Sequence, residues 1–108
     1  MTDISRPLKR LLGRKIGKID QAVNYLNAKF AGGGDLMVHN SVSMIHPRNA
    51  NFEVVENCRI VKIIEDPQSI EFHFDNGSIL SVSLILNQSI GVESMQLVMP
   101  GEPIVVWN

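Results

Sequence analysis

The chain has 108 residues, of which 44% are hydrophobic and 19% charged, with a formal net charge of −1 at pH 7. This length and apolar content suit one domain with its own core, and the single Cys58 excludes an intramolecular disulfide and fits a reducing compartment. The sequence contains no long apolar run and no signal-peptide pattern, so we expect a cytoplasmic protein that neither enters a membrane nor is exported.

The small net charge hides a difference along the chain. Residues 1–18 contain six basic residues and one acidic residue, whereas residues 19–108 contain four basic and ten acidic residues. Such asymmetry is typical of a binding face, although an unevenly charged solvated surface has the same composition. The basic residues have no aromatic residues interleaved and no nucleic-acid motif follows them, so we expect no direct binding to nucleic acid.

The N-terminal part of the chain predicts a short helix and three strands. Ser5 is the predicted N-cap of a helix over Arg6–Leu12, and Gly13 ends it. A bulge is expected between Asn40 and Ser43, because the alternation of apolar residues loses phase there. The predicted strands cover residues 14–23, 24–30 and 35–45.

The chain after the third strand predicts a loop at residues 46–51 and a long strand at residues 52–65. A turn follows at Asp66-Pro67. Beyond the next hairpin we expect a turn at residues 87–91 and a C-terminal hairpin. The two strands of that hairpin cover residues 95–99 and 104–107.

The clearest predicted element is a β-hairpin over residues 70–84. Apolar and polar residues alternate on both sides of an Asn-Gly pair, as in a half-buried hairpin. A two-residue turn would place Phe72 and Leu80 on opposite faces of the hairpin. A three-residue loop over residues 75–77 places them opposite each other, so that all the apolar residues share one face. We therefore predict the three-residue loop, with Gly77 in a left-handed conformation.

An offset of 44 residues maps this hairpin onto the N-terminal half of the chain. Seven of the 24 residues from 15 to 38 are identical to their counterparts, and they are Ile16, Lys18, Ile19, Phe30, Gly33, Leu36 and Val38. Duplication of a three-strand unit explains the identities, as does the general likeness of two hairpins in one sheet. We divide the single domain 1–108 into similar units at about 13–45 and 57–86, and a C-terminal hairpin at about 94–107.

These elements predict an all-β fold of about eight strands, built from two similar three-strand units with a short N-terminal helix or arm. The strands are short, mostly separated by turns, and we expect sequential strands to be neighbours. The arrangement is either an antiparallel sandwich or an open barrel.

The sequence offers no constellation typical of an enzyme, and we expect no catalytic residues and no cofactor. The three histidines and Cys58 do not have the spacing of a zinc site. The glycine-rich residues 31–34 lack the Lys-Ser/Thr pair and the helix of a phosphate-binding loop, and they are better read as a hairpin loop.

The candidate partner-binding residues are mainly acidic. Trp107 is included because tryptophan is enriched at binding hot spots, although it also serves as an ordinary strand residue that closes a core. A last strand at a sheet edge would also allow pairing with a second copy, so a homodimer remains open. The predicted contact residues are Glu65, Asp66, Glu71, Asp75 and Trp107.

The pattern Leu12-Gly13-x-x-Ile16-x-x-Ile19 is followed by Cys58-x-Ile60-x-x-Ile63 and then Ile70-x-Phe72-x-Phe74-x-x-Gly77-x-x-Leu80-x-Val82. Over most of residues 12–86 this pattern resembles small β-rich bacterial immunity proteins of polymorphic and contact-dependent toxin systems. The resemblance implies a cytoplasmic, non-catalytic inhibitor that binds and occludes one toxin.

The charge of the chain suggests which kind of partner such an inhibitor would meet. The acidic second half suits a basic partner, such as a nuclease toxin, through charge complementarity. The alternative is a small-molecule-binding or structural β-domain with its ligand between the two units.

Overall fold

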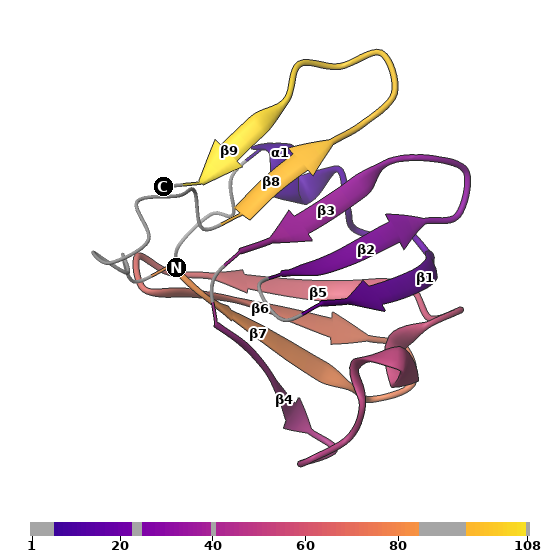
Figure 1. Ribbon diagram of the computed structural model, residues 1–108, viewed down its shortest axis with the longest axis vertical. Helices are drawn as coiled ribbons and strands as arrows, with labels where there is room; N and C mark the ends of the chain where they lie inside the picture. Colours follow the sequence, from indigo (N-terminus) through magenta and orange to yellow (C-terminus); the bar gives the residue numbers. More distant parts are fainter. Residues whose placement is uncertain (1–5, 23–24, 40, 85–94, 108) are drawn as a thin grey trace.

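The computed structural model describes residues 6–22, 25–39, 41–84 and 95–107, and it contains two antiparallel sheets (Figure 1). In one sheet the order is β1 (Ile16–Gln21), β2 (Leu26–Phe30), β3 (Asp35–Val38), β8 (Met95–Val98) and β9 (Val105–Trp107). In the other the order is β4 (Val42–His46), β7 (Ile79–Ser83), β6 (Ser69–Phe74) and β5 (Ile60–Glu65). The predicted all-β antiparallel class is confirmed, and the two sheets do not close into a barrel.

The central hairpin has the predicted register. Phe72 lies opposite Leu80 and Ile70 lies opposite Val82, so the apolar residues of β6 and β7 share the core face. The Phe74 amide donates to the Ser78 carbonyl oxygen at 2.9 Å, which closes the three-residue loop. Gly77 has a φ of +88°, a conformation that costs glycine little and other residues more.

The two three-strand units are built alike. In β1–β2, Ile16 pairs with Phe30 and the register shifts by one residue before Lys18. In β5–β6, Ile60 pairs with Phe74 and the same shift occurs before Lys62. The offset of 44 residues therefore relates pairing and bulge position as well as residue identity.

Each unit gives its next strand to the other unit. The chain leaves β3 and enters β4, which pairs with β7, and Val42 faces Val82. The chain also leads from β7 to β8, which pairs with β3, and Met95 faces Val38. The prediction of one strand over residues 35–45 was wrong, because the chain passes from one sheet to the other there. Sequential strands are neighbours within each unit and in the C-terminal hairpin, as expected, but β3 and β4, β4 and β5, and β7 and β8 are not.

The long strand predicted over residues 52–65 was also wrong. Its first part is the 3₁₀ turn η1 (Phe52–Val55), and β5 begins only at Ile60. Between them Asn57 has a φ of +66°, which a continuous strand does not allow. The predicted N-terminal helix is present as α1 (Arg6–Lys9), which ends earlier than expected.

Some predictions fall on parts of the chain outside the described residues. These are the Ser5 cap, the turn at residues 87–91 and one end of the predicted bulge, Asn40. The C-terminal hairpin is confirmed, because β8 and β9 pair antiparallel with Leu97 opposite Val105.

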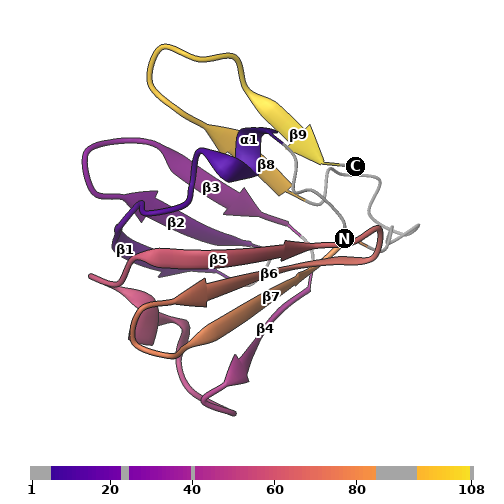
Figure 2. The same ribbon diagram turned by 180° about the vertical axis from the view of Figure 1, so that it is seen from behind.

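The core lies between the inner faces of the two sheets, where apolar side chains of both units meet. Leu8 and Leu11 belong to this core, and α1 lies over the β8 side of the five-stranded sheet (Figure 2). Among the described residues, no helix has the length and apolar character needed to cross a bilayer. The fully buried large side chains are Phe72, Leu8, Leu11, Leu26, Ile60, Ile70, Met95, Val38, Val55 and Val82.

Candidate binding site

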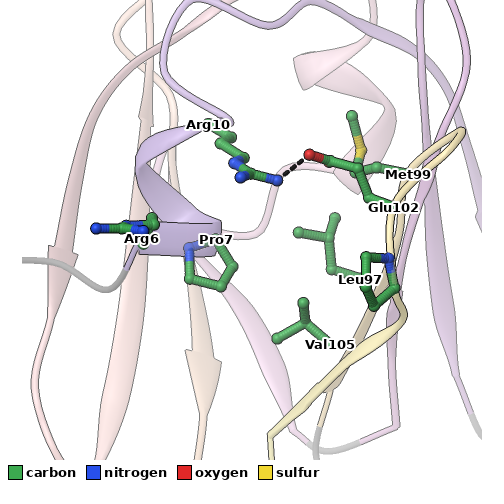
Figure 3. A pocket seen from close by; sticks show the side chains of 8 residues that line it. Arg6, Pro7, Arg10, Leu97, Met99, Glu102 and Val105 are labelled. Carbon is green, nitrogen blue, oxygen red and sulfur yellow. Dashed lines mark hydrogen bonds and ion pairs between the residues drawn. The ribbon is translucent and has the colours of Figure 1, made fainter.

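The N-terminal helical turn presents one side to the core and another to the C-terminal hairpin. Leu8 and Leu11 are fully buried. Arg6 and Pro7 precede Arg10 by four and three positions, which places these three residues on one side of the turn. Pro7 and Arg10 lie toward the hairpin, whereas the Arg6 side chain extends away from it (Figure 3).

A cavity of about 140 Å³ lies between this side of the turn and the β8–β9 hairpin. Leu97 and Val105 are opposite each other in the hairpin and form part of its wall (Figure 3). Arg10 reaches across the rim to Glu102, with which it forms a hydrogen-bonded ion pair. The cavity is lined by Arg6, Pro7, Arg10, Leu97, Met99, Glu102, Pro103 and Val105.

The size of the cavity limits its ligand. An apolar protein cavity of about 150 Å³ accommodates benzene, whereas pockets for drug-sized ligands and cofactors measure about 300–1,000 Å³. The cavity therefore has room for one aromatic ring or one branched aliphatic side chain.

Three of the residues that line the cavity are charged. Two arginines and one glutamate leave one net positive charge. The side chains of Arg10 and Glu102 are 53% and 33% exposed, so water screens their ion pair and its net stabilisation is small. Among the described residues, the Arg6 guanidinium has no hydrogen-bond or ion-pair partner. Its side chain extends away from Leu97, Val105 and Glu102, so the Arg6 charge is not directed into the cavity (Figure 3).

The hairpin that borders the cavity also ends the five-stranded sheet. Within the described residues β9 is the last strand, so its outer edge has no neighbour. Ile104 is 57% exposed and Val106 is 41% exposed, and residues 104–107 carry no charge. Sheet edges in globular proteins are commonly protected by charged residues, prolines or bulges, and this edge has none after Pro103.

The predicted acidic contact residues do not form one cluster. Glu65 ends β5, and Asp66 accepts hydrogen bonds from the amides of Gln68 and Ser69 in the turn that follows. Asp75 lies in the loop at the other end of β6, a strand of six residues and so about 17–20 Å long.

Two of these carboxylates have hydrogen-bond partners within the second unit. Asp75 accepts a hydrogen bond from the Arg59 amide at 3.2 Å. Glu71, in the middle of β6, contacts the His73 ring nitrogen Nε2 at 3.1 Å. The structure therefore brings Glu65 close to Asp66 but separates both from Asp75.

Trp107 lies in β9 opposite Met95 and packs, partly buried, against the core. It occupies the same short strand as the exposed Val106, whose side chain is on the other face. The tryptophan thus anchors the strand whose outer edge is unpaired.

A second hollow, of about 260 Å³, lies over β4, β6 and β7 in the four-stranded sheet. Most of its wall consists of serine side chains, which provide hydroxyl groups but no charge. It is lined by Ser41, Val42, Ser43, Gln68, Ser69, Ser81 and Ser83.

Cys58 does not have the surroundings of a nucleophile. Burial raises the pKa of its thiol, and the nearby Asp75 carboxylate raises the pKa further. The thiol is therefore neutral at physiological pH, and the sulfur lies 3.6 Å from the Val54 carbonyl oxygen. In the described ranges, no three His, Cys, Asp or Glu residues gather in a way that could hold a metal ion.

Sequence reasoning missed the cavity because its two walls are far apart in the chain. Arg10 and Glu102, which face each other across the rim, are 92 positions apart. The basic N-terminal stretch and the uncharged residues 104–107 were visible separately in the sequence. No local pattern indicates that one lies against the other.

No known protein family, curated protein or solved structure matches this chain.

Proposed function

We propose that this protein is a non-catalytic module that binds another protein through β9 and the cavity beside it. The observation that carries the proposal is an uncharged, exposed sheet edge next to a cavity of about 140 Å³. Unpaired edges accept strands of partner chains through backbone hydrogen bonds, and neighbouring pockets select their side chains. The two features lie together because Val105 belongs to both.

The size of the cavity favours a protein over a small-molecule ligand. Binding hot spots in protein interfaces are commonly single large side chains in well-packed pockets. The volume of the cavity is sufficient for one such side chain. The alternative of a ligand between the two three-strand units draws no support from this cavity. It lies between α1 and the C-terminal hairpin, away from the junction of the units.

The more specific form of the proposal is that the partner is a bacterial toxin domain, which the bound module occludes. The resemblance of residues 12–86 to immunity proteins supports this form. The acidic residues Glu65, Asp66, Glu71 and Asp75 would attract a basic toxin before contact. They lie in and beside the four-stranded sheet, so their contribution is separable by mutation from that of β9.

Capture of partners from native cells, followed by mutation of the edge, tests the proposal. The tagged protein is expected to retain one protein in stoichiometric amount. The double variant Ile104→Lys and Val106→Lys is expected to lose it, because charges on an edge strand oppose strand addition. Val61→Lys is the matched control, since Val61 is also 57% exposed but lies in β5 of the other sheet.

Two results would overturn the proposal. One is the absence of any protein retained in stoichiometric amount. The other is a partner that the β9 double variant retains as well as the Val61→Lys control does. If light scattering shows that the retained protein is a second copy, the edge mediates a homodimer. Reversal of Glu71 and Asp75 to lysine tests the acidic contribution separately, and unchanged affinity would remove the basic-partner form alone.

A further inference from the structure

We infer that each half of the chain is a binding partner for the unlike half of a second copy of the same chain. The N-terminal half comprises residues 6–46, and the C-terminal half comprises residues 52–107. The surface concerned lies between the halves and not at the edge of β9, so the inference is independent of the proposed function. It is carried by the symmetry of the contacts between the halves and by two places where that symmetry is broken.

The two halves contact each other through equivalent hydrogen bonds. The Gly13 amide donates to the Ile60 carbonyl oxygen at 2.7 Å, and the Asn57 amide donates to the Ile16 carbonyl oxygen at 2.7 Å. Adding 44 to the first donor and subtracting 44 from its acceptor gives the second donor and acceptor. A surface that meets its own equivalent in this way has the geometry of an isologous interface, by which identical subunits pair. The contacts between the halves are therefore those that two separate subunits would make.

The strands β4 and β8 follow the same symmetry, because each half gives one strand to the sheet of the other. Val42 faces Val82 in one sheet, and Met95 faces Val38, the equivalent of Val82, in the other. Separation of the halves would leave one edge of β3 and one edge of β7 without these neighbours. Unpaired strand edges readily accept a strand from another chain. A half without its own partner would therefore accept the same strand from a second copy.

A polar contact breaks the symmetry and disfavours pairs of two N-terminal halves. The Ile19 amide donates a hydrogen bond to Glu56 Oε2 at 2.8 Å across the boundary between the halves. The residue 44 positions before Glu56 is Leu12, whose side chain has no acceptor. Two N-terminal halves would therefore lose this bond at both Ile19 amides, and a partly buried amide without an acceptor is costly.

A difference in side-chain size disfavours pairs of two C-terminal halves. Ala28 in β2 and Phe72 in β6 are equivalent, and both are buried in the shared core. Phe72 is the largest of the fully buried side chains among the described residues. Two C-terminal halves would place phenylalanine at both positions and overfill the core, and two N-terminal halves would leave a cavity there. One small and one large residue therefore favour the unlike pair.

A cleavable form of the full chain tests whether the halves bind each other. A protease recognition sequence is inserted after Asn49, in the exposed loop between β4 and η1, where insertion is well tolerated. After cleavage, native mass spectrometry should show both halves in one complex, and the urea midpoint should rise with protein concentration. The uncleaved form is the control, and its midpoint should not depend on concentration. Separated halves after cleavage, or a midpoint that stays independent of concentration, would overturn the inference.

Mixing two copies tests which halves pair. Cleaved protein labelled with ¹⁵N and unlabelled cleaved protein are unfolded together in urea and then refolded. We expect complexes with one labelled and one unlabelled half, each containing one N-terminal and one C-terminal half. The absence of such hybrids would overturn binding between copies. Pairs of like halves as abundant as the unlike pairs would overturn the inferred preference.

Variants of the uncleaved chain test the size difference. Ala28→Phe and Phe72→Ala should each lower the urea midpoint, and the double variant should recover part of the loss because it again has one large and one small residue. Ala28→Phe combined with Ile70→Ala is the matched control, since Ile70 is another fully buried residue of β6. Its losses should add. Additive losses in both combinations would overturn the role of side-chain size.

Variants of the cleaved protein test the polar contact. Glu56→Leu should raise the dissociation constant of the two halves about tenfold, the effect of a hydrogen bond to a charged acceptor. Glu56→Gln keeps an acceptor for the Ile19 amide and should raise the dissociation constant less. Equal effects of the two substitutions would overturn the role of Glu56 in pairing.

Discussion

Lys15 and Arg59 form an isolated antiparallel bridge between the two sheets, and they occupy the same position in the two three-strand units, 44 residues apart. The two hydrogen bonds beside the bridge are equivalent, because adding 44 to one donor and subtracting 44 from its acceptor gives the donor and acceptor of the other. The Ile16 amide donates a hydrogen bond to the Cys58 carbonyl oxygen at 2.9 Å, and the Ile60 amide donates one to the Arg14 carbonyl oxygen at 3.0 Å. A local twofold axis that relates the two units therefore passes through the bridge.

The helical turns that precede the units follow the same relationship. The Arg14 amide donates to the Leu11 carbonyl oxygen at 3.0 Å, and the Cys58 amide donates to the Val55 carbonyl oxygen at 3.1 Å. With β4 and β8 exchanged between the sheets, the arrangement is that of a strand-swapped pair of similar units within one chain. The hairpin strand β9 is an addition to one side of this pair.

The equivalence of Gly13 and Asn57 gives the first prediction. Their φ values are +84° and +66°, a region that asparagine tolerates better than alanine does. A Cβ atom at Gly13 would meet nothing within 4 Å, so only backbone conformation decides the cost. We expect Gly13→Ala to lower the free energy of unfolding by about 1–2 kcal/mol and Gly13→Asn by less than half of that. Urea denaturation of the two variants measures the difference, and an equal cost for both would contradict the equivalence.

The glycine-rich loop gives a second prediction, because two of its glycines differ in their surroundings. Gly32 and Gly34 both have positive φ values, of +90° and +100°. A Cβ at Gly32 would meet open space, but one at Gly34 would lie 2.6 Å from the sulfur of Met99 and 3.2 Å from the Val98 carbonyl oxygen. Gly34→Ala should therefore destabilise the protein more than Gly32→Ala, by an additional 1–3 kcal/mol of overpacking, as an order of magnitude.

The comparison is made by thermal or urea unfolding of the two single variants under identical conditions. Because the flexible Met99 side chain can move, Gly34→Ala combined with Met99→Ala separates the two contacts. If the double variant recovers nothing, the Val98 carbonyl oxygen is the main obstacle. Equal costs for Gly32→Ala and Gly34→Ala would show that the loop does not pack against the end of β8.

The features of the fold that could be predicted from the sequence are those decided by neighbouring residues. The parity of apolar residues around Gly77 required a three-residue loop, and the structure has it. The offset of 44 residues likewise predicted two similar units, because each unit repeats the same buried positions. The position of η1 was available from the same offset, since Phe52 and Val55 correspond to Leu8 and Leu11 of the predicted helix.

The features that could not be predicted depend on distant parts of the chain. Residues 35–38 and 42–46 read as one strand, because the alternation of side chains does not show that their hydrogen-bond partners lie in different sheets. The four acidic residues are close in sequence, but an extended strand carries Asp75 away from Glu65. The candidate cavity depends on the packing of residues 6–10 against residues 97–105, which no local pattern encodes.

The buried Phe72 gives a third prediction, on the stability of the core. Its side chain is 1% exposed, and Phe72→Ala should cost about 3–5 kcal/mol through lost burial and the cavity left behind. Val61→Ala, at a position that is 57% exposed, should change stability by no more than about 0.5 kcal/mol. If Phe72→Ala does not fold, Phe72→Leu with a smaller loss provides the measurement. A similar effect at both positions would place Phe72 outside the core.

The Cys58 thiol gives a prediction on pH dependence. Burial raises its pKa, and the Asp75 carboxylate adds to the rise. The folded protein therefore holds the thiol proton more tightly than the unfolded chain does. The resulting stabilisation is complete below the unfolded pKa, about 8.5, and it is lost as the pH rises from there through the higher folded pKa.

Urea denaturation between pH 7 and pH 10 measures this loss, and Cys58→Ala should remove that part of the pH dependence. Replacement of Asp75 by asparagine removes the charge but keeps an acceptor for the Arg59 amide. The thiol pKa should then fall toward its ordinary value, because the carboxylate no longer opposes the thiolate. Alkylation of Cys58 by iodoacetamide at pH 8.5 should accordingly be faster in Asp75→Asn than in the parent protein, and faster still in urea. An unchanged alkylation rate in Asp75→Asn would mean that burial alone controls the thiol.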